Sequence, residues 1–326
     1  MSVDSTPAQM AGQPPAILLM GPTASGKTAL ALALARRFPV GIISVDSAQV
    51  FRDMNIGTAK PDHETLAATP HRLIDLVSPE ERYSAARFCA DSLAAMADIA
   101  TAGRIPLLVG GTMLYFHTLY TGMDGLPAAD PAKRAVIEAR LAAEGAAALH
   151  AELGRLDAAS AARIMVNDHQ RLIRALELIT SSGKTPSAHY AAQRRAAPPW
   201  QTLAIALNPP RAVLHERIAA RFQHMIAAGF IDEVAVLKAR PHLGAATPAM
   251  RSVGYRQIWQ YLDGMTDRAT AIEQGIIASR RLAKRQITWM NNGLRQVFDL
   301  HHYDPLQGPD APLGAIADFI NKKPLP

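Results

Sequence analysis

Residues 21–30, GPTASGKTAL, carry the spacing G-x-x-x-x-G-K-[ST] of a phosphate-binding loop. A short apolar run, residues 16–20 (AILLM), precedes the loop, and a run rich in Ala and Leu, residues 29–37, follows it. The first run predicts a buried strand and the second a helix. The motif requires this context, because backbone amides and the positive end of a helix together attract phosphate oxygens. The predicted phosphate loop consists of Gly21, Pro22, Thr23, Ala24, Ser25, Gly26, Lys27 and Thr28.

Further apolar runs extend this unit into an α/β fold. Residues 41–45 and 105–109 predict two more strands, and a helical pattern covers residues 85–101 between them. Alternating strands and helices favour a parallel sheet with helices on both faces, as in P-loop NTPase-like proteins. Ligands of such sheets bind beyond the carboxyl ends of the strands. We therefore expect one site there, formed by the phosphate loop, Asp46-Ser47 and Gly110-Gly111-Thr112.

The rest of the chain predicts an interrupted core. Residues 117–200 lack strand patterns and predict several helices, whereas residues 202–207 (TLAIAL) predict a strand. We therefore expect a helical insertion between two parts of one core. The expected boundaries are a disordered N-terminus at 1–14, a core at 15–116 and 201–300, an insertion at 117–200 and a peripheral tail at 301–326. A second GKT, at residues 183–185, lacks the first glycine of the motif, because position 178 is leucine, and is predicted to end a helix.

Composition narrows the class of protein. Of the 326 residues, 49% are hydrophobic, which is enough for a sizeable core. The net charge of the chain is +6, which is compatible with a polyanionic partner. The single cysteine, Cys89, excludes an internal disulfide and a cysteine zinc site. The pair His301-His302 predicts a solvated surface rather than a metal site. No membrane span and no secretion signal are predicted, so we expect a cytoplasmic protein with no membrane partner. We also expect a monomer.

Asp46 is the candidate acidic group of the site. An Asp at a strand end holds the water of the metal in many phosphate-loop NTPases. The same carboxylate is suited to act as a base on a second substrate, and an isolated Asp in a loop usually caps a turn. The neighbouring Ser47 and Gln49 add polar groups suited to reading a base edge. The strand at 105–109 is not followed by a carboxylate, which weakens the NTPase interpretation.

Basic residues are concentrated in three patches. Residues 211–295 contain 13 Lys or Arg against 6 Asp or Glu, mainly within 251–259 (RSVGYRQIW) and 280–290 (RRLAKRQITWM). In the second patch the helical spacing puts three cations on one face, namely Arg281, Lys284 and Arg285. Aromatic residues interleave with both patches and are candidates for base stacking or for the core: Tyr255, Trp259 and Trp289. The third patch, 168–177 (DHQRLIRALE), carries Arg171 and Arg174 one helical turn apart, and three separate patches favour a long anionic partner.

Together these pieces resemble one family, the tRNA dimethylallyltransferases. The matching stretches keep one order along residues 16–290: GPTASGKTAL, ISVDSAQVFRDMNIGTAKP, HRLIDL, YSAARF, GRIPLLVGGTMLY, NDHQRLIRALE, SGKT, RFQHMIAAGF, RSVGYRQIW and LAKRQITW. The family often has Tyr at the position of Phe51 and Asp at that of Asn55. It also has a further Arg where this chain has Met290 and Asn291.

The resemblance implies a substrate and a set of roles. It implies transfer of a dimethylallyl group from dimethylallyl diphosphate to N6 of adenosine 37, next to the anticodon, in tRNAs that read codons starting with U. The implied catalytic residues are Asp46 as the base, Thr112 near the reacting adenine, and Lys27 and Arg221 on the diphosphate. Thr28 would hold Mg²⁺, and the insertion would grip the anticodon stem-loop. The implied tRNA contacts are Asp46, Ser47, Ala48, Gln49, Thr112, Arg134, Gln170, Arg171, Leu172, Ile173, Arg174, Arg251, Ser252, Val253, Gly254, Tyr255 and Arg256.

Two other classes of function stay open at this point. A P-loop kinase of a small molecule or nucleotide shares the motif, but the missing strand-end carboxylate and the number of basic patches disfavour it. A non-enzymatic RNA-binding protein with a decayed loop is disfavoured because the loop residues Gly21, Gly26, Lys27 and Thr28, together with Asp46, are all intact.

Overall fold

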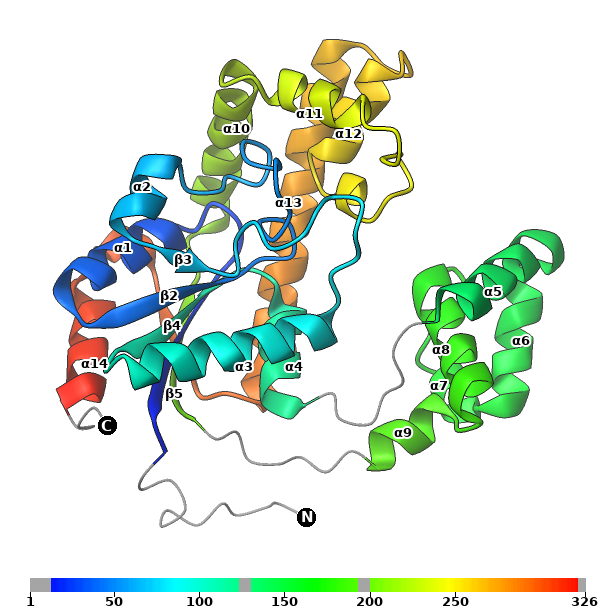
Figure 1. Cartoon of the computed structure of the whole chain (residues 1–326), viewed down its shortest axis with the longest axis horizontal. Helices are drawn as coiled ribbons and strands as arrows, with labels where there is room; N and C mark the ends of the chain where they lie inside the picture. Colours follow the sequence, from blue (N-terminus) through cyan, green and yellow to red (C-terminus); the bar gives the residue numbers. More distant parts are fainter. Residues whose placement is uncertain (1–12, 123–129, 193–199, 322–326) are drawn as a thin grey trace. The chain divides into compact units, whose positions relative to one another are not determined.

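The computed structural model describes residues 13–122, 130–192 and 200–321 (Figure 1). The chain divides into two compact units, residues 1–120 with 198–326, and residues 121–197. The division lies within a few residues of the insertion expected at 117–200. The expected disordered N-terminus lies outside the described residues except for its last two positions.

The first unit is built on a six-stranded sheet in which all the paired strands are parallel. Across the sheet the order is β3 (His71–Arg72), β2 (Val40–Val45), β4 (Ile105–Gly110), β1 (Pro15–Met20), β5 (Gln201–Leu207) and β6 (Leu300–Tyr303). All four strands predicted from apolar runs are present, and they are the four central ones. They are buried almost throughout, which explains their unbroken hydrophobic sequence, because both faces of a parallel sheet are covered. The predicted α/β fold class is confirmed.

Alternate residues of each strand face different helices, and these helices cover the two faces of the sheet (Figure 1). Leu18 and Leu108 belong to the hydrophobic cluster that includes α3 (Ala85–Thr101) and α4 (Met113–Thr121). Their strand neighbours, such as Leu19 and Leu107, belong to the cluster that includes α1 (Lys27–Arg37) and α14 (Asp310–Asn321). Each strand therefore buries side chains in two separate cores, and the sheet holds the loops at its carboxyl end in fixed positions.

A third core lies among helices that come late in the chain. It combines side chains of α10 (Arg211–Ala227), α11 (Phe230–Lys238), α12 (Tyr255–Leu262) and α13 (Arg268–Asn292) with Val50, Phe51 and Met54 from the loop after β2. α11 and α12 pack beside one end of α13 (Figure 1). In its described part the unit also has α2 (His63–Ala68) and the short 3₁₀ turns η2 (Ala249–Arg251), η3 (Leu294–Gln296) and η4 (Pro305–Gln307).

The second unit is helical in its described part, as predicted. Its helices are α5 (Pro131–Glu144), α6 (Ala146–Leu156), α7 (Ala158–Ala161), α8 (His169–Ser182) and α9 (Pro186–Ala192). Leu149, Leu153 and Leu172 are fully buried at the centre of its own hydrophobic cluster. Gly183 follows α8 as its left-handed C-cap, so the second GKT ends a helix and is no phosphate loop.

The expectation of a peripheral tail from residue 301 was wrong. Residues 300–303 form β6, which pairs with β5 at the edge of the sheet. Leu313 and Ile316 of α14 are buried in the same cluster as α1, and Ile316 is fully inaccessible. The sheet needs this cover, because the central strands would otherwise expose an apolar face to water. No helix in the described part of the chain is long and apolar enough to cross a membrane.

Candidate active site at the carboxyl end of the sheet

The phosphate loop forms the turn between β1 and α1. Gly26 is in the left-handed region with φ 94°, which glycine adopts without strain, and α1 begins at the next residue. The Ser25 amide donates to the Pro22 carbonyl at 3.2 Å, which closes the loop. Thr28 is exposed in the first turn of α1. The free amides of a helix N-terminus at this place form a site for an anion.

Lys27 lies over its own loop. Its ammonium donates to the Pro22 carbonyl at 2.6 Å and lies 3.4 Å from the Ser25 hydroxyl. Burial, and after it the positive charge of Arg221, lower the pKa of Lys27 to about 7, while the Asp46 carboxylate opposes the shift. Burial also lowers the pKa of Arg221, against the same carboxylate. The structure thus brings three of the predicted catalytic residues within electrostatic range of one another, with two basic groups and one acidic group.

Asp46 and Thr112 together shape the loop after β2. The Asp46 Oδ1 atom accepts from the Ala48 amide at 2.8 Å and from the Gln49 amide at 3.3 Å. The Thr112 hydroxyl oxygen accepts from the Ser47 amide at 3.0 Å. This bond joins the loops after β2 and β4, because Thr112 is the second residue after β4. Asp46 is partly accessible and holds its turn through one oxygen, which leaves its other oxygen outside these turn-closing bonds.

Gly111 allows the loops after β1 and β4 to approach each other. A Cβ atom at this position would lie 3.2 Å from the Gly21 carbonyl oxygen and 2.5 Å from the Gln286 side-chain nitrogen. Gln286, on α13, accepts from the Thr23 amide and donates to the Gly111 carbonyl, both at 2.9 Å. The sequence reasoning did not single out Gln286. The available signal was its place on α13, three residues after the buried Ala283 and away from the basic face.

Tyr115 is a second residue that the sequence reasoning missed. Its ring stacks on Phe88 with centroids 4.2 Å apart, and Tyr83 meets it edge-on at 6.5 Å. Burial, followed by the negative charge of Asp46, raises the pKa of the Tyr115 hydroxyl. An aromatic wall therefore lies within electrostatic range of the candidate base.

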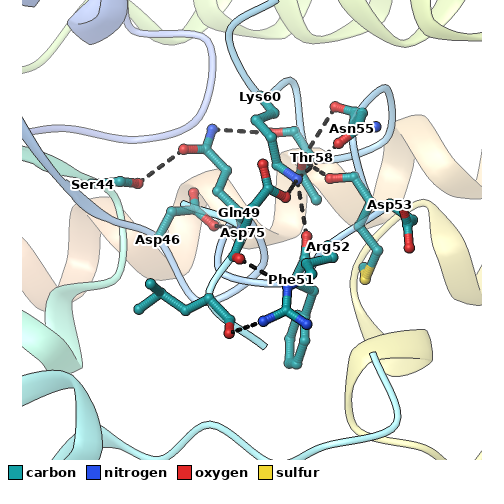
Figure 2. A network of polar contacts seen from close by, with 12 residues as sticks. Ser44, Asp46, Gln49, Phe51, Arg52, Asp53, Asn55, Thr58, Lys60 and Asp75 are labelled. Atoms are coloured by element: carbon teal, nitrogen blue, oxygen red, sulfur yellow. Dashed lines mark hydrogen bonds and ion pairs between the residues drawn. The ribbon is translucent and has the colours of Figure 1, made fainter. Parts of the chain in front are cut away.

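Gln49 has a structural role that differs from base reading. Its side-chain oxygen accepts from the Ser44 hydroxyl at 2.9 Å, and its nitrogen donates to the Thr58 carbonyl at 3.3 Å (Figure 2). The same nitrogen also donates to the Ala59 carbonyl at 3.3 Å. Both polar ends of the amide thus hold the loop after β2. Lys60 continues this network with bonds to the Phe51 carbonyl and the Asn55 side chain, and with an ion pair to Asp75 (Figure 2).

The aromatic residues of the first basic patch belong to the core. Tyr255 is fully buried and Trp259 is 6% exposed, so of the three candidates for base stacking only Trp289 is accessible, at 37%. The Tyr255 hydroxyl donates to Glu233 at 2.5 Å, and the same carboxylate accepts three backbone amides of residues 55–57. Arg251 and Arg256 are exposed, Ser252 and Val253 are partly buried, and Gly254 is buried.

The predicted contacts on the insertion divide into accessible and structural residues. Gln170 and Arg171 are exposed, whereas Leu172 and Ile173 are buried in the core of the unit. Arg174 and Arg134 lie 3.0 and 3.7 Å from Glu177, whose side chain is fully buried. The carboxylate also accepts the Asp130 amide at 2.8 Å. Both arginines therefore neutralise a buried charge in their own unit.

The donors around the phosphate loop fit Mg²⁺. Thr28 supplies an exposed hydroxyl and Asp46 a carboxylate, and both are the hard oxygen ligands that Mg²⁺ prefers. Among the residues that the structure describes, no group of three or more His, Cys, Asp or Glu side chains is placed to hold a metal ion.

Known proteins resemble the chain over most of its length. The family model IPP transferase matches residues 49–293, and the model Isopentenyl transferase matches residues 15–82. The tRNA dimethylallyltransferase of Dichelobacter nodosus is 54% identical over 93% of this chain and 96% of its own. That of Azoarcus sp. (strain BH72) is 57% identical over 92% and 93%.

Solved structures agree with these relatives. The full-length tRNA isopentenylpyrophosphate transferase of Bacillus halodurans is 34% identical with a TM-score of 0.66, covering 94% of this chain and 96% of that one. A eukaryotic dimethylallyltransferase acting on tRNA is 26% identical with a TM-score of 0.80, covering 96% and 81%. The sequence matches and the shared fold together show that the chain belongs to the IPP transferase family of tRNA dimethylallyltransferases.

Proposed function

We propose that the protein transfers the dimethylallyl group of dimethylallyl diphosphate to N6 of adenosine 37 in tRNAs that read codons starting with U. The observation that carries the proposal is the clustering of Lys27 and Arg221 with Asp46 beside a phosphate loop. The matched relatives are named for this activity, and the basic patches suit a nucleic-acid substrate. The phosphate loop then holds a diphosphate instead of a nucleotide.

In the reaction the allylic C–O bond breaks and a C–N bond to N6 forms. Negative charge develops on the leaving diphosphate, where Lys27, Arg221 and loop amides stabilise it. The Thr23 amide is not one of them, because it donates to Gln286. Thr28 would hold Mg²⁺, and a bound Mg²⁺ would supply further positive charge beside the leaving group.

Asp46 takes the proton that N6 loses. The N6 lone pair is delocalised into the adenine ring, and a carboxylate is only a weak base. N6 becomes acidic as the new bond forms, so proton transfer to Asp46 comes late. Thr112 accepts from the Ser47 amide next to Asp46, and this position supports its proposed contact with the reacting adenine. Flipping the target base out of the anticodon loop costs little free energy, because a loop base is already unpaired.

The test is incubation of the purified protein with bulk tRNA, Mg²⁺ and dimethylallyl diphosphate, followed by mass analysis of the nucleosides. We expect adenosine with one added dimethylallyl group, and its loss when residue 37 of a transcribed tRNA is changed from adenosine to guanosine. A protein that binds tRNA and donor but leaves every nucleoside mass unchanged contradicts the proposal.

A further inference from the structure

Gln286 is a polar residue on the inward face of an amphipathic helix. On α13 it lies three residues from Ala283, which is 1% exposed, and next to Ile287. Ile287 and Ala24 of the phosphate loop both pack against the hydrophobic cluster that contains Ala283. The basic residues Arg281 and Lys284 of the same helix are exposed. A polar side chain on a packed face has to find polar partners, because an unmade hydrogen bond there is costly.

The two ends of the Gln286 amide meet two different loops. The oxygen accepts from the Thr23 amide and the nitrogen donates to the Gly111 carbonyl, both at 2.9 Å. The residue after Gly111 is Thr112, which accepts from the Ser47 amide beside Asp46. Next to Thr23, the Pro22 carbonyl accepts a hydrogen bond from the Lys27 ammonium. One side chain thus joins the half of the site that holds the leaving group to the half that holds the base.

We propose that Gln286 is a positioning residue that sets the spacing between the phosphate loop and the Asp46–Thr112 side of the site. The proposal rests on the proposed function. Each half has internal hydrogen bonds of its own, such as Lys27 to Pro22 and Asp46 to Ala48, so each half keeps its shape without the bridge. The paired strands β1, β4 and β2 hold the two halves at their bases. The bridge fixes the remaining distance between the loops themselves, which determines whether the prenyl carbon and N6 meet.

The first variant is Gln286→Leu, which has a similar size and neither hydrogen bond. We expect the single-turnover rate at saturating donor and tRNA to fall about 100-fold, because a misplacement near 1 Å costs that much. Donor and tRNA dissociation constants, measured separately, stay within about three-fold, because each half binds its own ligand. The matched control is Gln274→Leu, the same change at an exposed position of α13, which keeps the full rate.

The second variant, Gln286→Glu, gives a signature that simple loss of packing does not produce. A protonated Glu accepts from Thr23 and donates to Gly111 as Gln does, whereas an ionised Glu has no proton for the Gly111 carbonyl. An unperturbed Glu has a pKa near 4.3, so its protonated fraction grows as pH falls from about 8 to about 5.5. The ratio of the saturated rate of this variant to the wild-type rate therefore rises over the same range. For Gln286→Leu the same ratio does not change with pH.

The outcomes separate the two proposals. If the wild type forms no prenylated adenosine, the proposed function fails. If the wild type is active and both Gln286 variants match it, the positioning role is overturned. It is equally overturned if Gln286→Leu loses only donor affinity, or if the rate ratio of Gln286→Glu does not change with pH.

Discussion

Arg221 on α10 lies within electrostatic range of Lys27 at the start of α1, and its positive charge is the second cause, after burial, that lowers the pKa of Lys27 to about 7. The two basic groups come from opposite parts of the chain and face one acidic group, Asp46. Without an anionic ligand the site therefore disfavours the charged form of its own lysine.

Donor binding is expected to take up a proton. At pH about 8 the free Lys27 is mostly neutral, and a bound diphosphate raises its pKa again, so uptake approaches about one proton per donor. Donor affinity therefore falls as pH rises above about 7. Calorimetric titration in two buffers of different ionisation enthalpy measures the uptake. Lys27→Met should remove it, and a wild-type enthalpy independent of the buffer contradicts the prediction.

Asp46→Asn tests the base while keeping the turn. The amide oxygen of Asn still accepts from the Ala48 and Gln49 amides, so the loop is expected to keep its shape. Turnover should fall by about 10²–10⁴-fold, the usual contribution of general-base catalysis, with tRNA binding within a few-fold. Quench-flow rates and filter binding check both, with Asp98→Asn on the exposed face of α3 as control. Near-normal turnover would remove Asp46 from this role.

The two arginines of α8, Arg171 and Arg174, are expected to have different functions. Arg171 is 70% exposed, so Arg171→Ala should weaken tRNA binding and reduce the slope of log affinity against log salt by about 0.7–0.9. Its free energy of unfolding should stay within about 0.5 kcal/mol of the wild type, because its ion pair with Asp168 is exposed. An unchanged salt slope would mean that this face of the insertion does not bind tRNA.

Arg174→Ala should act mainly on stability. It removes one of two cations from the fully buried Glu177, and Arg134 and the Asp130 amide remain. We expect a loss of about 1–3 kcal/mol in the free energy of unfolding, less than for a buried charge left without any partner. Urea denaturation measures it. An unchanged midpoint together with a flattened salt slope would assign Arg174 to tRNA instead.

ATP hydrolysis is not expected. Hydrolysis needs a positioned water and stabilisation of the γ-phosphoryl group. The residues directly after β4 are Gly111 and Thr112, so no carboxylate follows this strand, and the Gly111 carbonyl accepts from Gln286. Purified protein should therefore release no phosphate from ATP, with or without tRNA. Release that tRNA stimulates and Lys27→Ala abolishes, without prenylated adenosine, would favour the kinase or NTPase alternative.

The sequence by itself determined the framework of the site. Each central strand is a run of apolar residues, and the phosphate loop stands between a strand and a helix, so neighbours in the chain carry the signal. The helix predicted at residues 85–101 has those bounds in the structure. Because parallel strands end at one edge of the sheet, the meeting of Lys27 and Asp46 also followed from local patterns.

Only the tertiary structure decided which polar and aromatic residues serve that framework. Tyr255 and Trp259 are aromatic residues within a basic stretch, which is typical of a surface that stacks on bases, but both are buried in the core. Tyr255 is buried because Phe230 of α11 packs against its ring and Glu233 of α11 accepts a hydrogen bond from its hydroxyl. The tail from residue 300 adds a strand only because β5 offers a free edge. Gln286 meets Thr23 across 263 positions of chain. Such contacts depend on packing between distant segments, and no local period in the sequence encodes them.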